Sequence, residues 1–278
     1  MISLFFNDTT RGPGKVAKNL ILGLNKLGVE FNVNPTKISD DDNIISLQIN
    51  GIMNTEHISG SIIGPNICVL PTDNSVVMNQ QYNKLIVPCQ WVKNTFMKWL
   101  PEDKLFMWAV GIDTDLFLDK SNETKTNDCL IYLKRRSQVE LNVIKELLIR
   151  KGQSFEVIEY GSYNEHKFIE TISRSRYGII IDNTESQGIA IEEMMSCNLP
   201  LLVWDVTHWV DRGEEHKIEA TSIPYWDERC GLSFTKSEEI EITYNKFINN
   251  LNTFKPRDYI LDNLTLEKSA QKLLNILK

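Results

Sequence analysis

Two glutamates, Glu185 and Glu193, flank a glycine where the sequence changes from an apolar run to a helical pattern. We expect a strand to end at Asp182 and a helix to begin beside Gly188. The first turn of a helix presents unpaired backbone N–H groups and a partial positive charge, so it can bind a diphosphate. Glu193 then lies about one turn into the helix, where its carboxylate can accept two hydrogen bonds from ribose hydroxyls. Glu185, on the preceding loop, can contact a sugar.

The junction between this loop and the helix is the predicted nucleotide-binding element. We expect it to bind through Gln187, Gly188, Ile189 and Glu193. Acidic residues in a first helical turn also have a plainer explanation, because each of them stabilises the helix electrostatically.

A basic run, Lys134-Arg135-Arg136, stands at the end of another apolar stretch. Such a local patch suits a phosphate or an anionic lipid. The alternative is a solvated charge run at the end of a strand.

Near the N-terminus, Gly12-Pro13-Gly14-Lys15-Val16-Ala17 has the spacing of a dinucleotide-binding fingerprint. That fingerprint requires a strand that runs straight into its first glycine. Here the polar stretch from Asn7 to Arg11 intervenes, so we reject a nicotinamide site. The segment instead predicts a glycine-rich loop, or simply a flexible turn before a helix.

Metal binding is not predicted. Two acidic runs, Asp113-Thr114-Asp115 and Asp40-Asp41-Asp42, mimic a D-x-D motif, but the first joins two domains and the second forms a polar turn. The four histidines are His57, His166, His208 and His216, and even the closest pair is too far apart in sequence to share a helix face. Only His208 is expected near the end of a strand.

The elements that must position these residues alternate between strand and helix patterns. Strands are predicted at 2–6, 29–33, 44–47, 67–70, 84–87 and 104–110, and helices at 16–27 and 91–100. After a polar stretch come strands at 129–133, 155–160, 177–182 and 199–204, with helices at 139–150, 164–173 and 189–196. This is an α/β pattern of two Rossmann-like, doubly wound domains facing across a cleft. We predict domains at 1–118 and 129–263, a linker at 119–128, and a helix at 264–278 closing back on the N-terminal domain.

Composition and charge exclude several classes of protein. The formal charge of −7 opposes binding to a nucleic-acid backbone. No apolar run is long enough to span a membrane, although peripheral association stays open. Five cysteines without a C-x-x-C pair indicate reduced thiols, and the N-terminus lacks the pattern of a signal peptide. These features predict a cytoplasmic protein.

The acidic motif resembles the E-x(7)-E signature of the family 4 group of GT-B glycosyltransferases. The matching positions are Glu185, Gly188, Glu193, Met195, Leu199 and Pro200. Val87-Pro88-Cys89-Gln90-Trp91-Val92-Lys93 resembles the family's Pro-Ser-Glu-Trp-Val helix start, and the segment from Trp108 to Phe117 resembles its interdomain segment. These matches occur in the family's order, while the middle of the first domain matches weakly.

The resemblance implies a role for each candidate residue. Glu193 would hold the donor ribose, and Glu185 would hold the transferred sugar and act in catalysis. Arg135 is the best match to the family's catalytic arginine on the diphosphate, with Lys134 and Arg136 as further donor-binding residues. Gly12, Gly14 and Lys15 would face the donor phosphates and the acceptor. One family lysine is replaced by Glu140, and Lys134 would take its place.

A departure from the family concerns Asp73. Many retaining members carry a histidine near the sugar, and Asp73 stands roughly in that place. In a retaining reaction the leaving phosphate can accept the proton of the acceptor, whereas an inverting reaction needs a general base, which Asp73 would supply. The motif favours retention and leaves inversion open.

The resemblance therefore predicts a glycosyltransferase, hexosyl- or pentosyltransferase in type, that needs no metal or cofactor. It would transfer a sugar from a UDP- or GDP-sugar to a hydroxyl of a glycan or another acceptor. One alternative is a nucleotide-sugar epimerase of GT-B architecture, although such chains are usually longer and need additional acid and base residues. Another is a non-catalytic sugar-nucleotide binder, which the joint presence of Glu185, Glu193 and the arginines disfavours.

Overall fold

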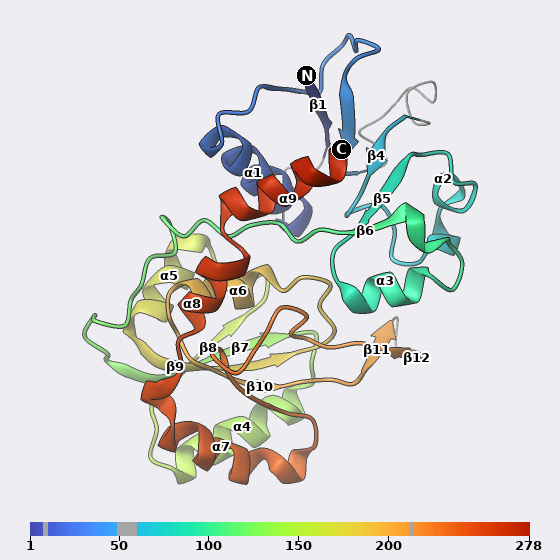
Figure 1. The fold of residues 1–278 in the computed structure, drawn as a ribbon. Coiled ribbons are helices and arrows are strands. Elements are labelled where there is room, and N and C mark those ends of the chain that lie inside the picture. Colours follow the sequence, from blue (N-terminus) through green and yellow to red (C-terminus); the bar gives the residue numbers. More distant parts are fainter. Residues whose placement is uncertain (8–10, 49–59, 212–213) are drawn as a thin grey trace. The chain divides into compact units, whose positions relative to one another are not determined.

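The computed structural model describes residues 1–7, 11–48, 60–211 and 214–278 (Figure 1). The chain divides into two compact units. The first comprises Met1–Gly111 together with Leu264–Lys278, and the second comprises Ile112–Asn263. Each unit is an α/β structure built around its own parallel sheet.

The first unit contains a six-stranded sheet in the order β2-β1-β3-β4-β5-β6. All of the paired strands are parallel. The strands are β1 (Ile2–Phe5), β2 (Phe31–Val33), β3 (Asn43–Ser46), β4 (Ile62–Ile63), β5 (Lys84–Val87) and β6 (Leu105–Met107). The helices are α1 (Arg11–Lys26), α2 (Ser75–Met78), α3 (Gln90–Phe96) and α9 (Leu266–Leu277), with short 3-10 turns at Pro71–Asp73 and Glu102–Lys104.

The C-terminal helix α9 returns to the first unit and packs along α1, as the sequence predicted (Figure 1). A side chain on Gly23 of α1 would come within 2.5 Å of the Leu266 carbonyl oxygen, so glycine permits this close approach. The Trp108 indole donates a hydrogen bond to the Ser269 carbonyl (2.9 Å), and the Ser269 hydroxyl donates to the Ala109 carbonyl (2.6 Å). These buried bonds fix α9 beside the end of β6.

The second unit contains a five-stranded parallel sheet in the order β13-β10-β9-β7-β8 and a separate antiparallel hairpin. The sheet strands are β7 (Asn127–Lys134), β8 (Phe155–Glu159), β9 (Ser175–Asp182), β10 (Leu201–Trp204) and β13 (Gly231–Phe234), and the hairpin strands are β11 (His208–Asp211) and β12 (Glu214–Glu219). The helices are α4 (Gln138–Arg150), α5 (Glu165–Arg174), α6 (Ile189–Ser196), α7 (Ile240–Asn249) and α8 (Pro256–Asn263), with 3-10 turns at Ser237–Glu239 and Leu251–Thr253.

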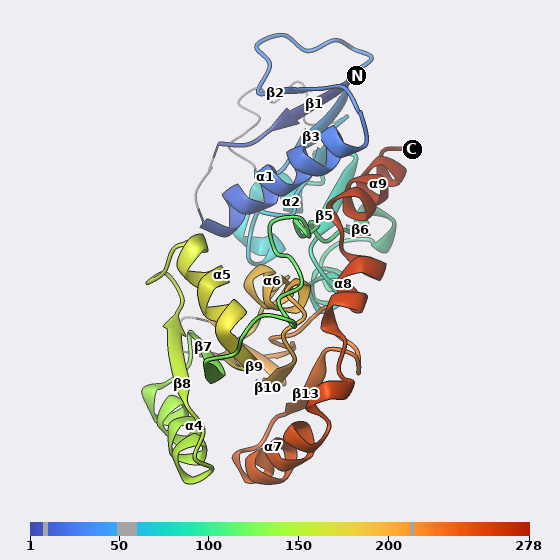
Figure 2. The same ribbon diagram turned by 90° about the vertical axis from the view of Figure 1, so that its left-hand side faces the viewer.

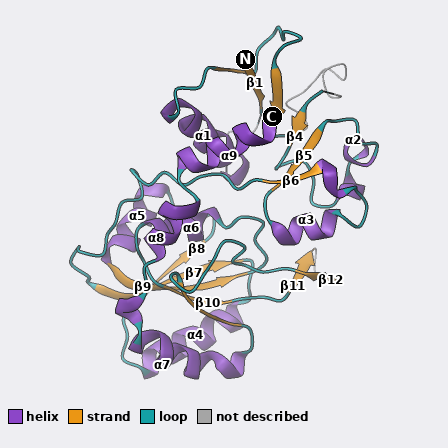
Figure 3. Cartoon of the chain, viewed as in Figure 1, coloured by secondary structure: helices purple, strands orange, loops and turns teal. Residues whose placement is uncertain are grey.

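Alternation along the central strands divides the second core between two faces of the sheet. Cys129, Ile131 and Leu133 of β7 share a buried cluster with residues of α4 and α7. Tyr132, on the opposite face of β7, lies against Phe168 of α5, with ring centroids 6.2 Å apart. Helices α4 and α7 therefore cover one face of this sheet, and α5 lies on the other (Figure 2; Figure 3).

Two predicted features of the first unit differ in type from the structure. The apolar run 67–70 is not a strand, and β4 lies earlier, at Ile62–Ile63. Both β4 residues are buried, whereas Val69 is 54% exposed, so this run lacks the burial of a strand. Gly12, Gly14 and Lys15 belong to the first turns of α1 rather than to a loop, because α1 begins at Arg11.

The segment 119–128, predicted to be a linker, lies within the second unit. The Lys120 N–H donates to the Cys197 carbonyl (3.0 Å), and the Lys125 ammonium donates to the Ser173 carbonyl (2.8 Å). Its last two residues already belong to β7. The division between the units falls earlier, after Gly111.

No helix within the described residues is long and apolar enough to cross a membrane.

Candidate functional site

The residues with the most distinctive chemistry lie at the carboxyl ends of the parallel strands of the second unit. Lys134 ends β7 and is directly opposite Asp182, which ends β9. Asp205 follows β10 directly. Because the carboxyl ends of parallel strands meet at one edge of a sheet, side chains from separate sequence segments are brought together here.

Lys134 and Glu185 form an ion pair at this edge. Their side chains are only 12% and 11% exposed, so the pair is largely shielded from water. The Lys134 ammonium also lies over the Tyr160 ring, 4.6 Å from its centroid. In this arrangement the charge of Lys134 balances that of Glu185.

Arg135 and Arg136 have opposite environments, although they are neighbours in sequence. The Arg136 guanidinium pairs with Glu140 and donates hydrogen bonds to the carbonyls of Asp182 (3.1 Å) and Trp204 (3.3 Å). Arg135 is exposed and makes no hydrogen bond or ion pair with any residue that the structure describes. Its backbone has φ of +53°, a left-handed conformation that is uncommon for a residue other than glycine. Arg135 is thus the arginine available to an anion, while Arg136 binds the ends of β9 and β10.

Glu140, which replaces a lysine of the family pattern, has a local structural role. Its carboxylate accepts a hydrogen bond from the Ser137 N–H (2.9 Å), and the Ser137 hydroxyl accepts one from the Glu140 N–H (3.2 Å). This reciprocal capping begins α4. Burial acts to raise the pKa of Glu140, but hydrogen bonds from Arg136 and Ser137 outweigh it and lower that pKa.

The predicted helix after Glu185 is α6, and it has the predicted bounds, Ile189–Ser196. Gly188 precedes it with φ of +86°, in the left-handed conformation that glycine adopts most readily. The Glu192 N–H donates to the Gly188 carbonyl (3.0 Å), which starts the helical bonding. Glu193 is on α6 and is 2% exposed. The junction thus places a helix N-terminus and a buried carboxyl beside the Lys134–Glu185 pair.

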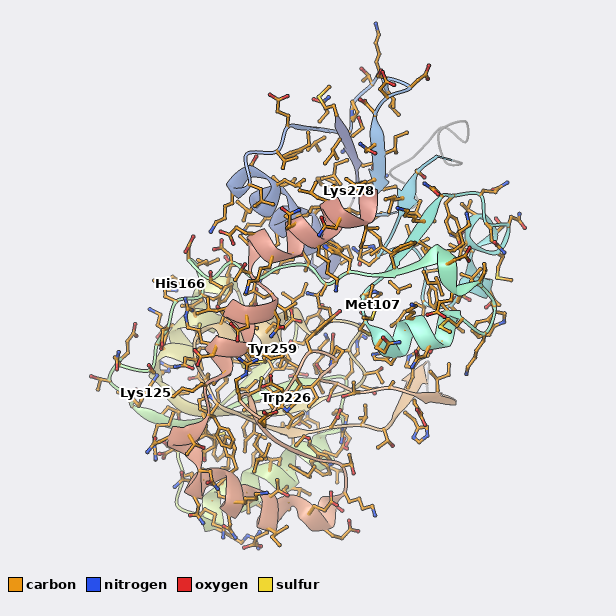
Figure 4. The ribbon with its side chains drawn as sticks, in the orientation of Figure 1. Met107, Lys125, His166, Trp226, Tyr259 and Lys278 are labelled. Carbon is orange, nitrogen blue, oxygen red and sulfur yellow. The ribbon has the colours of Figure 1, made fainter. Side chains whose placement is uncertain are left out.

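Gln187, predicted to contact a donor, holds a second buried acid. Its side-chain amide donates to Oε2 of Glu192 (3.1 Å), whereas Oε1 of Glu192 has no hydrogen-bond partner among the described residues. Glu192 is 1% exposed, and this burial raises its pKa well above the ordinary value. Burial first, and then the proximity of the Glu192 carboxyl, raise the pKa of Tyr259 on α8, which is labelled in Figure 4. Burial therefore favours the protonated form of Glu192, on the helix that packs against α8.

Asp182 is a site residue that the sequence analysis did not select. It is 1% exposed, and its Oδ1 accepts a hydrogen bond from the Asn183 N–H (2.7 Å). Burial first, and then the neighbouring charge of Glu185, raise the pKa of Asp182 well above its ordinary value, against a lowering effect of Lys134. An acidic residue at the last position of an apolar strand is the sequence signal that points to it.

Asp205 is a second residue that sequence reasoning missed, and it supports the Glu185 loop. Its carboxylate accepts hydrogen bonds from the Ser222 N–H (2.7 Å) and from the hydroxyls of Thr221 and Ser222 (2.8 Å each). The Thr221 carbonyl in turn accepts a hydrogen bond from the Glu185 N–H (3.0 Å). The end of β10 thereby fixes the loop that carries Glu185.

The remaining candidates belong to the first unit. Asp73 is exposed and ends a 3-10 turn, where its Oδ2 accepts a hydrogen bond from the Leu70 N–H (3.1 Å). Gly12, Gly14 and Lys15 are at the start of α1. The structure therefore gathers Lys134, Arg135, Arg136, Gln187, Gly188, Ile189, Glu185 and Glu193 in the second unit, and Asp73 with the α1 residues in the first.

Within the described parts of the chain, no three histidine, cysteine or acidic side chains form a group that could hold a metal ion. Asp113 instead accepts hydrogen bonds from the N–H groups of Asp115 and Leu116 (3.1 Å each). Asp42 accepts one from the Ser3 hydroxyl (2.9 Å). His57 lies outside the described residues, and His208 is exposed on β11.

Comparison with known proteins gives matches in structure only. No protein-family model matches the sequence, and no curated protein sequence matches it. A structure of S. aureus TarM in complex with Fondaparinux, alpha-GlcNAc-glycerol and UDP is similar (TM-score 0.56, 11% identity), covering 95% of this chain and 59% of that one. The lipopolysaccharide outer core galactosyltransferase WaaB is also similar (TM-score 0.63, 8% identity), with coverage of 99% and 97%.

A third similar structure is a glycosyltransferase involved in avilamycin A biosynthesis (TM-score 0.59, 10% identity), covering 99% of this chain and 96% of that one. The chain thus spans nearly the whole of two neighbours and 59% of TarM. At these identities the likeness shows the fold. The chain has the GT-B fold, with two Rossmann-like α/β units, as the sequence predicted.

Replacing Glu192 by glutamine tests its protonation. Above pH 4.5, its ordinary pKa, the unfolded chain has released a proton that the folded protein still binds. The free energy of unfolding therefore falls by about 1.4 kcal/mol per pH unit from this group, until the raised folded pKa is reached. Glu192→Gln removes this loss and preserves an acceptor for Gln187, so the variant becomes progressively more stable than the native protein as pH rises.

Urea unfolding between about pH 4 and pH 8, followed by circular dichroism, measures this difference. Glu146→Gln, which alters an exposed glutamate on α4, is the control and should leave the pH dependence unchanged. A constant difference between Glu192→Gln and the native protein across this range would show that Glu192 is ionised in the folded state.

Proposed function

We propose that this protein is a glycosyltransferase that transfers a sugar from a UDP- or GDP-sugar to a hydroxyl of a glycan or another acceptor. The observation that carries the proposal is the junction between Glu185 and α6. There a helix N-terminus, an uncommitted guanidinium of Arg135 and the buried carboxyl of Glu193 occur at one edge of a parallel sheet. This combination provides complementary groups for a diphosphate and for a ribose.

Each predicted residue has a role in this proposal. The first turn of α6, with Gln187, Gly188 and Ile189, binds the diphosphate, and Arg135 stabilises its charge as the glycosidic bond breaks. Glu193 accepts hydrogen bonds from the ribose, and Glu185 orients the transferred sugar. Arg136 acts indirectly, by hydrogen-bonding to the ends of β9 and β10. Lys134 forms an ion pair with Glu185. Gly12, Gly14 and Lys15, in the first turns of α1, are proposed as further donor-binding residues.

The solved structures support this class of substrate. TarM was determined with UDP, and the similar pneumococcal O-GlcNAc transferase GtfA was determined with UDP and GlcNAc (TM-score 0.53, 13% identity). The proposed reaction retains configuration and needs no metal or other cofactor. The resemblance of Glu185 and Glu193 to the E-x(7)-E motif supports retention. A cytoplasmic location is part of the proposal, and the five free cysteines support it.

Incubation with a panel of nucleotide sugars distinguishes this function from its alternatives. A transferase releases free nucleoside diphosphate, and slowly does so even without an acceptor. An epimerase converts the sugar and largely keeps the nucleotide attached. A non-catalytic binder releases none, so binding without any release would reject transfer.

Glu193→Ala should weaken nucleotide binding, because a buried hydrogen bond to a charged group contributes about 1.5 to 3 kcal/mol. Calorimetry with UDP and with GDP measures the loss, which corresponds to roughly 10- to 150-fold in Kd. Glu192→Gln, at the adjacent position but facing α8, is the control and should bind within about twofold of the native protein. Equal affinities for the Glu193→Ala and native proteins would remove Glu193 from the donor site.

Arg135→Ala and Arg136→Ala should have different effects, because their environments differ. Arg135→Ala should lower turnover by about 100-fold with a smaller effect on donor affinity, since phosphate charge grows in the transition state. Arg136→Ala should lower turnover less but reduce the free energy of unfolding by about 1 to 3 kcal/mol, because it removes the ion pair with Glu140 and the hydrogen bonds to two strand-end carbonyls. Initial rates and urea unfolding measure both effects. A larger loss of turnover in Arg136→Ala than in Arg135→Ala would show that Arg136 contacts the diphosphate.

Asp73→Asn separates the two stereochemical outcomes. If the reaction retains configuration, the variant should keep substantial activity, because the leaving phosphate accepts the proton. If it inverts, loss of the general base should reduce the rate by about 100- to 10,000-fold. NMR of the product gives its anomeric configuration, and circular dichroism checks that the variant is folded. A retained anomer together with an inactive, folded Asp73→Asn protein would contradict both outcomes.

A further inference from the structure

The carboxyl of Asp182 has one oxygen without a donor. The residue is 1% exposed, and its Oδ1 accepts a hydrogen bond from the Asn183 N–H. No N–H or O–H of the described residues donates to its Oδ2. A buried carboxylate oxygen without a hydrogen-bond donor is unfavourable. This oxygen must therefore be stabilised in another way, for example by a proton of its own.

Among the described residues, the carboxyl of Glu185 lies within hydrogen-bonding reach of the Asp182 carboxyl. Two ionised carboxylates in contact repel each other, and a single proton between them removes the repulsion and satisfies both oxygens. Glu185 is also paired with Lys134, which sits opposite Asp182 in the sheet. With one proton on the carboxyl pair, the three side chains together are electrically neutral.

We infer that Asp182 and Glu185 share one proton, and that binding of a nucleoside diphosphate at the Glu185–α6 junction is coupled to retention or uptake of that proton. The second half of this inference rests on the proposed function. Loss of the proton would leave a net negative charge beside the place proposed for the diphosphate. The anion therefore binds the protonated pair more tightly, and its affinity falls by up to about tenfold per pH unit once the pair ionises.

The surrounding charges come from several elements. On β7 lie Tyr132 and Lys134, and Tyr163 precedes α5. Arg136 donates to the Asp182 backbone carbonyl, and its charge is already balanced by Glu140. Burial and Glu185 raise the pKa of Asp182, whereas Lys134 and the hydrogen bond from the Asn183 N–H act to lower it. Of the two buried acids on α6, Glu193 places negative charge near Tyr163, whereas burial favours the neutral form of Glu192.

The shared proton is tested directly by carbon NMR of protein labelled at aspartate carboxyls. One resonance should titrate above those of the exposed aspartates, and it should be absent from Asp182→Asn. It should persist in Glu192→Gln, in which another buried acid is altered. In Glu185→Gln the titration of this resonance should move to lower pH, because the like charge is gone and Lys134 can pair with Asp182. This variant keeps the test valid should Asp182→Asn fail to fold. Titration of Asp182 together with the exposed aspartates would overturn the inference.

Coupling to ligand is measured by calorimetry with UDP and with GDP in buffers of different ionisation enthalpy. The native protein should take up as much as one proton per nucleotide over the pH range in which the Asp182 resonance titrates. Asp182→Asn should take up none and should lose the decline of affinity with pH, whereas Glu192→Gln should keep both. Proton uptake that persists in Asp182→Asn would overturn the coupling.

Absence of binding by either nucleotide at every pH would reject the proposed function and the coupling with it. The NMR titration would then still decide whether Asp182 and Glu185 share a proton, so the two failures are distinguishable.

Discussion

Burial of negative charge at one edge of the second sheet is the constraint on which the site depends. Asp182, Glu185, Glu192 and Glu193 are each no more than 9% exposed. An ionised carboxylate removed from water is unfavourable unless a cation or strong donors replace its hydration. The chain meets this demand in different ways, because Lys134 pairs with Glu185 while burial raises the pKa values of Asp182 and Glu192. The charge of the site is therefore set by protons as well as by side chains.

The backbone around these acids turns sharply where strands end. Gly188 and Arg135 both adopt positive φ, but only glycine does so without a steric penalty from Cβ. For Arg135 the left-handed conformation costs about 1 to 2 kcal/mol. The contacts of Arg136 with Glu140 and with two strand-end carbonyls hold the chain there. One arginine thus fixes the turn, and its neighbour is left exposed.

Sequence reasoning located the parts of this site that depend on local pattern. The bounds of β5 and α6 agree with prediction because each run is delimited by turn-forming residues: Asn83 and Pro88 for β5, and Gly188 and Asn198 for α6. No strand or helix was predicted between residues 205 and 263. This segment contains β13, α7 and α8, whose hydrophobic partners are distant in sequence. Asp182 was missed because its burial, and its position opposite Lys134, depend on the pairing of strands that are distant in sequence. The different environments of Arg135 and Arg136 likewise depend on one φ angle, which residue type does not reveal.

The balance of charged side chains at the site also limits its affinity for an anion. Of the three consecutive basic residues at the end of β7, Lys134 is paired with Glu185 and Arg136 with Glu140, so among the described residues Arg135 alone of the three has no counter-ion. An incoming dianion would then meet one guanidinium and the partial positive charge of the α6 N-terminus. These together amount to less than two charges, so an additional ionised acid at Asp182 would offset much of the attraction. The affinity of such a site for a diphosphate is therefore governed by the protonation of its acids as much as by its single uncommitted arginine.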